Sequence, residues 1–157
     1  EPSSASHRLL AANARANPNC AWRTHHGAAW SQDGTIAFSN AALSTASRVT
    51  TEPGDERVPA WTLARLLAQA GGRADLVKID IEGAEEAVLG GGQGELAQIG
   101  TLVVEIHPDR CRELAVMGIL RDAFPRLYAI PGRKSLKPLI LATQHDAPWC
   151  LPTVSGV

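Results

Sequence analysis

Two short apolar runs on either side of one helical pattern most constrain what this chain can fold into. Residues 76–81 and 101–106 are rich in Val, Ile and Leu, as in strands that are buried on both faces of a sheet, with Lys78 as the exception. Gly83 opens the helical pattern between them, and the glycines at 90–92 end it. Strands that alternate with helices predict an α/β fold with a mostly parallel sheet.

Capping residues and the spacing of apolar residues predict three further helices. They begin after Ser3–Ser6, after Thr62 and at Pro108-Asp109, and they end near Pro18, at Gly71-Gly72 and near Asp122.

Further strands are predicted where β-branched and apolar residues lie between turn signals. These are a strand at 20–26, a small hairpin or strand-turn-strand around 32–34, and an antiparallel edge pair at 126–130 and 139–143, joined by the Pro131-Gly132 turn. Residues 39–56 are polar and predict a loop.

Composition limits the kind of protein. The chain has 157 residues with 45% hydrophobic residues, which fits a single domain over 1–157, with 144–157 as a loose tail. With 15 Lys and Arg against 16 Asp and Glu, we expect no nucleic-acid or membrane partner. The chain has no apolar run long enough to span a membrane, and its scattered cysteines (Cys20, Cys111 and Cys150) suit the cytoplasm. The oligomeric state stays open.

Candidate site residues follow the predicted strands, because ligands bind at the carboxyl ends of strands in open α/β sheets. Asp80 and Glu82 lie on one side of their strand by alternation, and Glu85 follows in the first helical turn. A carboxylate there also suits the helix dipole, so Glu85 has a purely structural alternative. The small residues 27–29 follow the predicted strand at 20–26.

Glu105 and His107 end the second apolar run, again on one side of the strand. The imidazole of His107 suits proton transfer near neutral pH, although a surface histidine before a proline is an equal alternative. Asp80, Glu82, Glu105 and His107 could together ligate a metal, but their spacing does not require one, and we expect none.

Several of these motifs together resemble the FkbM family of S-adenosylmethionine-dependent methyltransferases. The most specific is the block at 78–85, Lys-Ile-Asp-Ile-Glu-Gly-Ala-Glu, preceded by Trp61-Thr62-Leu63 and followed by Val104-Glu105-Ile106-His107. The resemblance covers residues 1 to 142. It implies a class I methyltransferase fold, which is a Rossmann-like, mostly parallel sheet with an antiparallel edge.

The resemblance also implies a cofactor site for S-adenosylmethionine. Glu1 would hold the ribose hydroxyls, since a carboxylate accepts two hydrogen bonds from a diol. Gly27, Ala28 and Ala29 would line the adenine, and Asp80 would lie beside the methionine part and the methyl group.

In such enzymes a first strand and a glycine-rich loop precede the acid matched to Glu1. We therefore expect the chain to be the C-terminal major part of a methyltransferase domain and to be inactive alone. The chain would then lack the first strand and nearly all of the second, and one edge of the strand at 76–81 would be unpaired.

The implied activity is O-methylation of a hydroxyl on a sugar, a polyketide or another small natural product. His107 is the first candidate for the base, and Asp80 and Glu82 are alternatives or orient the acceptor. The rival hypotheses are a non-catalytic, truncated domain that binds no cofactor and a metal-dependent hydrolase that chelators would inactivate.

Overall fold

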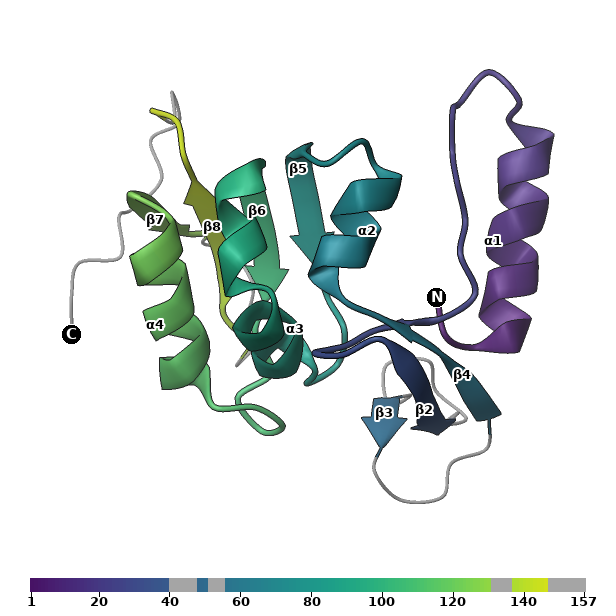
Figure 1. Cartoon of the computed structure of the whole chain (residues 1–157), viewed down its shortest axis with the longest axis horizontal. Helices are drawn as coiled ribbons and strands as arrows, with labels where there is room; N and C mark the ends of the chain where they lie inside the picture. The colour runs from purple at the N-terminus through teal and green to yellow at the C-terminus, as the bar shows by residue number, and fades with distance from the viewer. Residues whose placement is uncertain (40–47, 51–55, 131–136, 147–157) are drawn as a thin grey trace.

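Two four-stranded sheets organise the chain. The structure is a computed structural model that describes residues 1–39, 48–50, 56–130 and 137–146. The strand orders are β1-β4-β2-β3 and β5-β6-β8-β7. In Figure 1 the sheet of β5–β8 lies to the left of α2, and the sheet that contains β2, β3 and β4 lies below it and to its right. α1 is at the right of the same view.

The first sheet is built around β4 and includes strands that the sequence did not predict. Its members are β1 (Ala28–Ala29), β2 (Gly34–Ser39), β3 (Arg48–Thr50) and β4 (Glu56–Trp61). β1 lies parallel to β4, whereas β2 is antiparallel to both β4 and β3. The side chain of Asp33, in the turn before β2, accepts a hydrogen bond from the backbone of Thr62 at 2.9 Å. This bond ties the turn to the start of α2.

The second sheet carries the main core. Its strands are β5 (Ala74–Ile79), β6 (Ile99–Glu105), β7 (Arg126–Ala129) and β8 (Leu139–Thr143). β5 and β6 are parallel, and β8 is antiparallel to both β6 and β7. The helices are α2 (Leu63–Gln69), α3 (Glu85–Gly91), the 3₁₀ helix η2 (Gln93–Gln98) and α4 (Glu113–Ala123). In Figure 1, α2, α3 and α4 lie across one face of this sheet.

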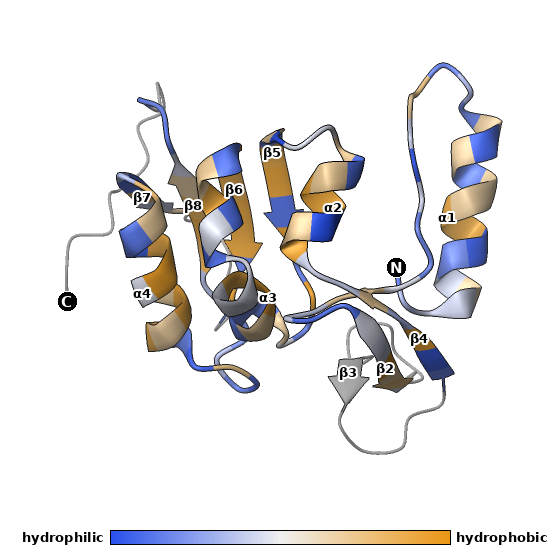
Figure 2. Ribbon diagram, in the orientation of Figure 1, coloured by the Kyte–Doolittle hydropathy of each residue, from blue (hydrophilic) through white to orange (hydrophobic). Residues whose placement is uncertain are grey.

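The core lies between those helices and the sheet. Leu89, Leu96, Leu102, Ile106 and Leu120 are fully buried in one hydrophobic cluster. In Figure 2 the strands β5 and β6 are coloured as hydrophobic over most of their length, as a sheet that packs against helices requires.

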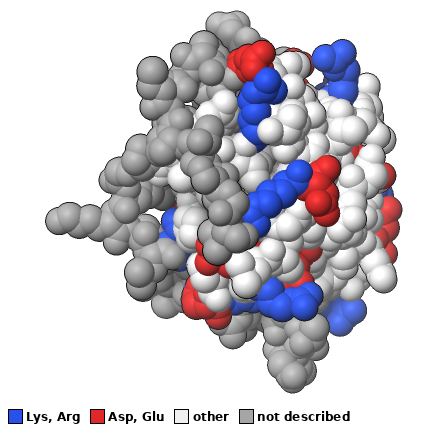
Figure 3. Space-filling view, turned by 90° about the vertical axis from the view of Figure 1, so that its left-hand side faces the viewer, with Lys and Arg blue, Asp and Glu red and all other residues white. Residues whose placement is uncertain are grey.

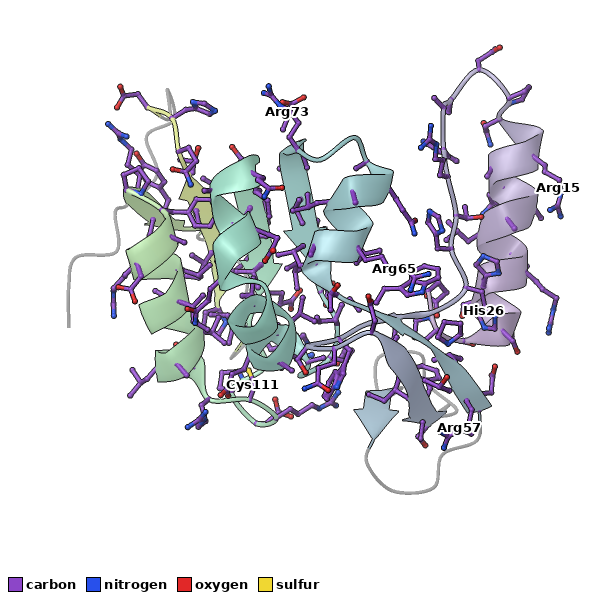
Figure 4. The ribbon with its side chains drawn as sticks, in the orientation of Figure 1. Arg15, His26, Arg57, Arg65, Arg73 and Cys111 are labelled. Carbon is purple, nitrogen blue, oxygen red and sulfur yellow. The ribbon has the colours of Figure 1, made fainter. Side chains whose placement is uncertain are left out.

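α1 (Ser4–Ala16) lies apart from this core and has no buried residue. Ser3 caps it by accepting a hydrogen bond from the backbone of Ser6, as the sequence predicts. The ring of His7 stacks on that of His26 at a centroid distance of 5.1 Å. His26 lies beside the first turns of α1 in Figure 4.

The expectation of a mostly parallel sheet is wrong. Two of the described strand pairings are parallel, β1 with β4 and β5 with β6, and the others are antiparallel. Short connections join β1 to β2 and β7 to β8, too short for a parallel crossover, so the chain reverses direction there.

Two strand predictions need correction. Residues 20–26 form no strand, and the strand of this region is β1 instead. The loop predicted over 39–56 contains β3 and the start of β4. Small and polar residues there gave no alternating pattern from which to predict strands.

The environment of β5 is also different from the prediction. It is not buried on both faces, since Leu76 keeps 64% of its surface exposed. The expected unpaired edge is present, because β5 pairs with β6 alone among the described residues.

Other predictions are confirmed. Thr62 caps α2, and β7 and β8 form an antiparallel pair. α4 begins at Glu113, later than predicted, because residues 108–112 form a connecting loop. The Pro131-Gly132 turn and most of the predicted tail lie outside the described residues. No helix in the described part of the chain is both long and apolar enough to cross a membrane.

Two leucines of α4 test this account of the core. Leu120 is fully buried and Leu114 is 81% exposed. We expect Leu120→Ala to lower the free energy of unfolding by about 2–5 kcal/mol, because it leaves a cavity. Leu114→Ala should change it by less than about 0.5 kcal/mol. Urea denaturation followed by circular dichroism measures both, and equal effects would contradict this packing.

Candidate functional site

Residues that follow the parallel strands β5 and β6 form the candidate site. Ile79 at the end of β5 is paired in register with Val104, near the end of β6. Asp80 and Glu82 come after β5, and His107 comes after β6. Because parallel strands end at the same edge of a sheet, the three side chains converge there. One ligand atom from each lies within 4.8 Å of the others.

A tight turn at Glu82 and Gly83 leads from β5 into α3. Glu82 has a φ of 54°, in the left-handed region that costs a non-glycine residue about 1–2 kcal/mol. Gly83 has a φ of 107°, and a Cβ atom there would lie 2.5 Å from the Cβ of Arg110. Glycine is therefore required for both its backbone conformation and the close approach of Arg110.

His107 and Glu85 form a fully buried pair beneath this turn. Nδ1 of His107 lies 2.8 Å from Oε1 of Glu85, and both side chains are 0% exposed. The same Oε1 accepts the backbone N–H of Gly83 at 3.1 Å. Glu85 therefore holds His107 in addition to suiting the dipole of α3, which was its purely structural explanation from the sequence.

Basic side chains surround the cluster. Oε2 of Glu82 accepts a hydrogen bond from Nη1 of Arg110 at 2.9 Å and lies 3.5 Å from Nζ of Lys137. Nζ of Lys78 donates to Oδ2 of Asp80 at 2.9 Å. Arg110 and Lys137 could not be predicted from the sequence. Residues 108–112 are predicted to begin a helix but form a loop, and no periodic pattern orients the side chain of Lys137.

The side chain of Cys111 also reaches this region and lies near α3 in Figure 4. Burial, followed by a hydrogen bond with Glu85, raises the pKa of the Cys111 thiol to about 11. The thiol is therefore protonated at neutral pH and is a poor nucleophile.

The residues predicted to bind the adenosine part lie on the other sheet. The backbone N–H of Gly27 donates to the carbonyl of Glu1 at 3.1 Å, which brings these two residues together. Oε1 of Glu1 accepts the N–H of Ser3 at 2.8 Å, and Glu1 remains exposed. In Figure 1 the N-terminus lies beside α1, and β5 and β6 lie on the other side of α2.

Gly27 and Ala28 are closely packed. A Cβ atom on Gly27 would lie 2.7 Å from the carbonyl oxygen of Pro59. Ala28 is buried against Phe38 and Val58, and Ala29 packs against the main core. Their small size serves the contact between β1 and β4, and their predicted cofactor role stays a prediction.

The geometry reduces the four candidate metal ligands of the sequence analysis to three. Asp80, Glu82 and His107 form a group that could hold a metal ion. The group leaves out Glu105, which is buried in β6.

The fold and the site together define a mixed α/β domain with a cluster of acids and a histidine at the carboxyl ends of two parallel strands. The family model of the methyltransferase FkbM domain matches residues 1–128. The chain belongs to the FkbM methyltransferase family. No curated protein and no solved structure matches it.

The turn before α3 gives a first test of the site. Gly83→Ala should lower the free energy of unfolding by about 1–3 kcal/mol, because alanine is strained at this positive φ and displaces Arg110. Gly118→Ala in α4 is the matched control, with no atom near its added Cβ, and should raise stability by about 0.5–1 kcal/mol. Thermal unfolding measures both variants. Equal effects in the two would exclude a special conformation at Gly83.

The contribution of the Glu86–Arg112 ion pair to the stability of the fold can be tested through its dependence on pH. Side-chain and backbone hydrogen bonds from Arg112 lower the pKa of Glu86. The resulting stability is present above the pKa of an unfolded glutamate, about 4.3, and is lost as the pH falls through the lower folded value. Glu86→Gln should therefore be slightly less stable than the wild type at pH 7. The difference should disappear in acid, and urea denaturation across this pH range measures it.

Proposed function

We propose that the protein transfers a methyl group from S-adenosylmethionine to a hydroxyl of a small molecule, such as a sugar or a polyketide. The proposal is carried by one observation: in a chain of the FkbM methyltransferase family, Asp80, Glu82 and His107 converge at the carboxyl ends of β5 and β6. Ligands of α/β sheets bind at this edge.

The exposed carboxylates suit this cofactor. Glu1 is exposed, and the side chain of Asp80 keeps 33% of its surface exposed. Glu1 would accept hydrogen bonds from the ribose hydroxyls, and Asp80 would attract the positive sulfur. When bound, S-adenosylmethionine supplies a methyl group on that sulfur as the electrophile.

The acid cluster would bind and orient the acceptor hydroxyl. Asp80 is the member that an acceptor reaches most easily, because His107 is fully buried. A carboxylate accepts the hydroxyl hydrogen bond and takes up its proton as the new C–O bond forms. His107 acts through Glu82, from which its Nε2 is 3.3 Å away. In this account His107 is a positioning residue, and its role as the base itself stays a prediction.

The distribution of charge supports a small acceptor. Figure 3 shows basic and acidic side chains next to each other on the face in view, rather than a patch of one sign. The ion pair between Arg126 and Asp146 is an example of opposite charges lying close together on this protein. A nucleic-acid partner would need a basic surface to neutralise its phosphates.

Conservative variants of the cluster test the catalytic proposal. Asp80→Asn should lower kcat by about 10²–10⁴-fold, because the amide cannot take up the proton. Asp109→Asn is the control, since Asp109 pairs with Arg110 but lies outside the cluster. Release of S-adenosylhomocysteine in the presence of hydroxyl-bearing acceptors measures turnover. Activity left intact by both Asp80→Asn and His107→Gln would refute the assignment.

Binding of the cofactor distinguishes this proposal from a non-catalytic domain. Equilibrium dialysis with labelled S-adenosylmethionine should show saturable binding that Asp80→Asn weakens. No binding to the folded protein would overturn the proposal for this chain. It would favour the non-catalytic alternative and agree with the expectation from sequence that the chain is inactive alone.

A further inference from the structure

The hydrogen bonds of His107 and Glu85 show which ring nitrogen of His107 is available to a ligand. Oε1 of Glu85 already accepts the N–H of Gly83 at 3.1 Å, so this oxygen acts as an acceptor. Its bond to Nδ1 of His107, 2.8 Å long, must then use the hydrogen of Nδ1. In a neutral imidazole this leaves the lone pair on Nε2, as in histidines that ligate metals.

Nε2 of His107 is buried and has no hydrogen-bond partner among the residues that the structure describes. It lies 3.3 Å from Oε2 of Glu82. A nitrogen lone pair and a carboxylate oxygen repel each other at this distance. Arg110 and Lys137, at 2.9 Å and 3.5 Å, balance the charge of the Glu82 oxygen, whereas a cation bound to both atoms would also use the lone pair of Nε2. Two ligands bound to one metal ion at about 2.1 Å lie roughly 3.0–3.4 Å apart, which matches this separation.

Although the sequence alone predicts no metal, we propose that Asp80, Glu82 and His107 bind a divalent transition-metal ion, with Mn²⁺ and Zn²⁺ as the class of ion that fits. The two carboxylates suit Mn²⁺ and Zn²⁺, and an imidazole nitrogen is a poor ligand for Ca²⁺ or Mg²⁺. Glu85 orients His107 from behind, as second carboxylates do at metal sites.

The basic neighbours would compete with the ion. Lys78 and Lys137 lie 2.9 Å and 3.5 Å from the carboxylate oxygens of Asp80 and Glu82. Lys78 is 61% exposed, so its ammonium group can turn into solvent when the ion enters. Arg110 can stay, because it also contacts the backbone carbonyl of Glu82 at 3.4 Å. Lys78→Ala should therefore strengthen metal binding.

With an ion bound, Asp80 would serve as its ligand rather than as the base, and the ion would make an acceptor hydroxyl more acidic, which would assist methyl transfer. The metal proposal nevertheless stands apart from the proposed function, because it is tested without cofactor or acceptor. Either proposal can fail while the other holds.

The test is a titration of the chelator-treated protein with MnCl₂, followed by the loss of the electron paramagnetic resonance signal of free Mn²⁺. ZnCl₂ and MgCl₂ are titrated in parallel by calorimetry. We expect one saturable Mn²⁺ or Zn²⁺ ion per chain. Asp80→Asn, Glu82→Gln and the orienting variant Glu85→Gln should each weaken binding by at least about 10-fold.

The control is Asp109→Asn, which removes a nearby acid outside the cluster and should leave the affinity unchanged. Circular dichroism shows whether each variant folds. If a variant at a buried position does not fold, Asp80→Asn still tests the proposal, because Asp80 is partly exposed. No saturable binding to the wild type would overturn the proposal. Binding of Mg²⁺ alone, or binding that Asp80→Asn and Glu82→Gln leave unchanged, would also overturn it.

Discussion

The hydrogen bond between His107 and Glu85 holds the candidate site together. Both side chains are completely buried, and their 2.8 Å contact joins the segment after β6 to the first turn of α3. Polar side chains that leave water need partners of this kind, because an unpaired buried group costs several kcal/mol. The N–H of Gly83 meets the same carboxylate, so one side chain fixes both the start of the helix and the turn before it.

The strained turn follows from this arrangement. With the start of α3 fixed against the end of β6, the chain leaving β5 must reverse within a few residues, and Glu82 and Gly83 take positive φ values. Arg110 then lies against Gly83 and holds the carboxylate of Glu82. Such strain persists where the surroundings hold it in place, and it clusters at functional sites. Here it directs the Glu82 side chain toward Asp80 and His107, where the proposed chemistry and metal binding would take place.

Much of the local structure could be predicted from the sequence. Ser3 and Thr62 cap helices as predicted, and the apolar runs at 76–81 and 101–106 correspond to β5 and β6 with shifted ends. The positions of Asp80, Glu82 and His107 could be predicted because each follows an apolar strand. The strands at 48–50 and 56–61 could not, because both are short, both contain charged residues, and the second also contains a proline. They form as strands by pairing with a strand that only the fold brings near.

The sequence by itself determined which residues form the helices and most of the strands of the second sheet. It also determined which polar residues follow the parallel strands β5 and β6. Both follow from side-chain spacing and capping, which are local properties. It also carried the residues by which the chain resembles the FkbM family. Only the tertiary structure decided that most strand pairs among the described residues are antiparallel, that Leu76 of β5 stays exposed, and that Glu85 binds His107 while Arg110 holds Glu82. The two side-chain contacts join residues 22 and 28 positions apart, and such contacts depend on how the elements pack rather than on any local pattern.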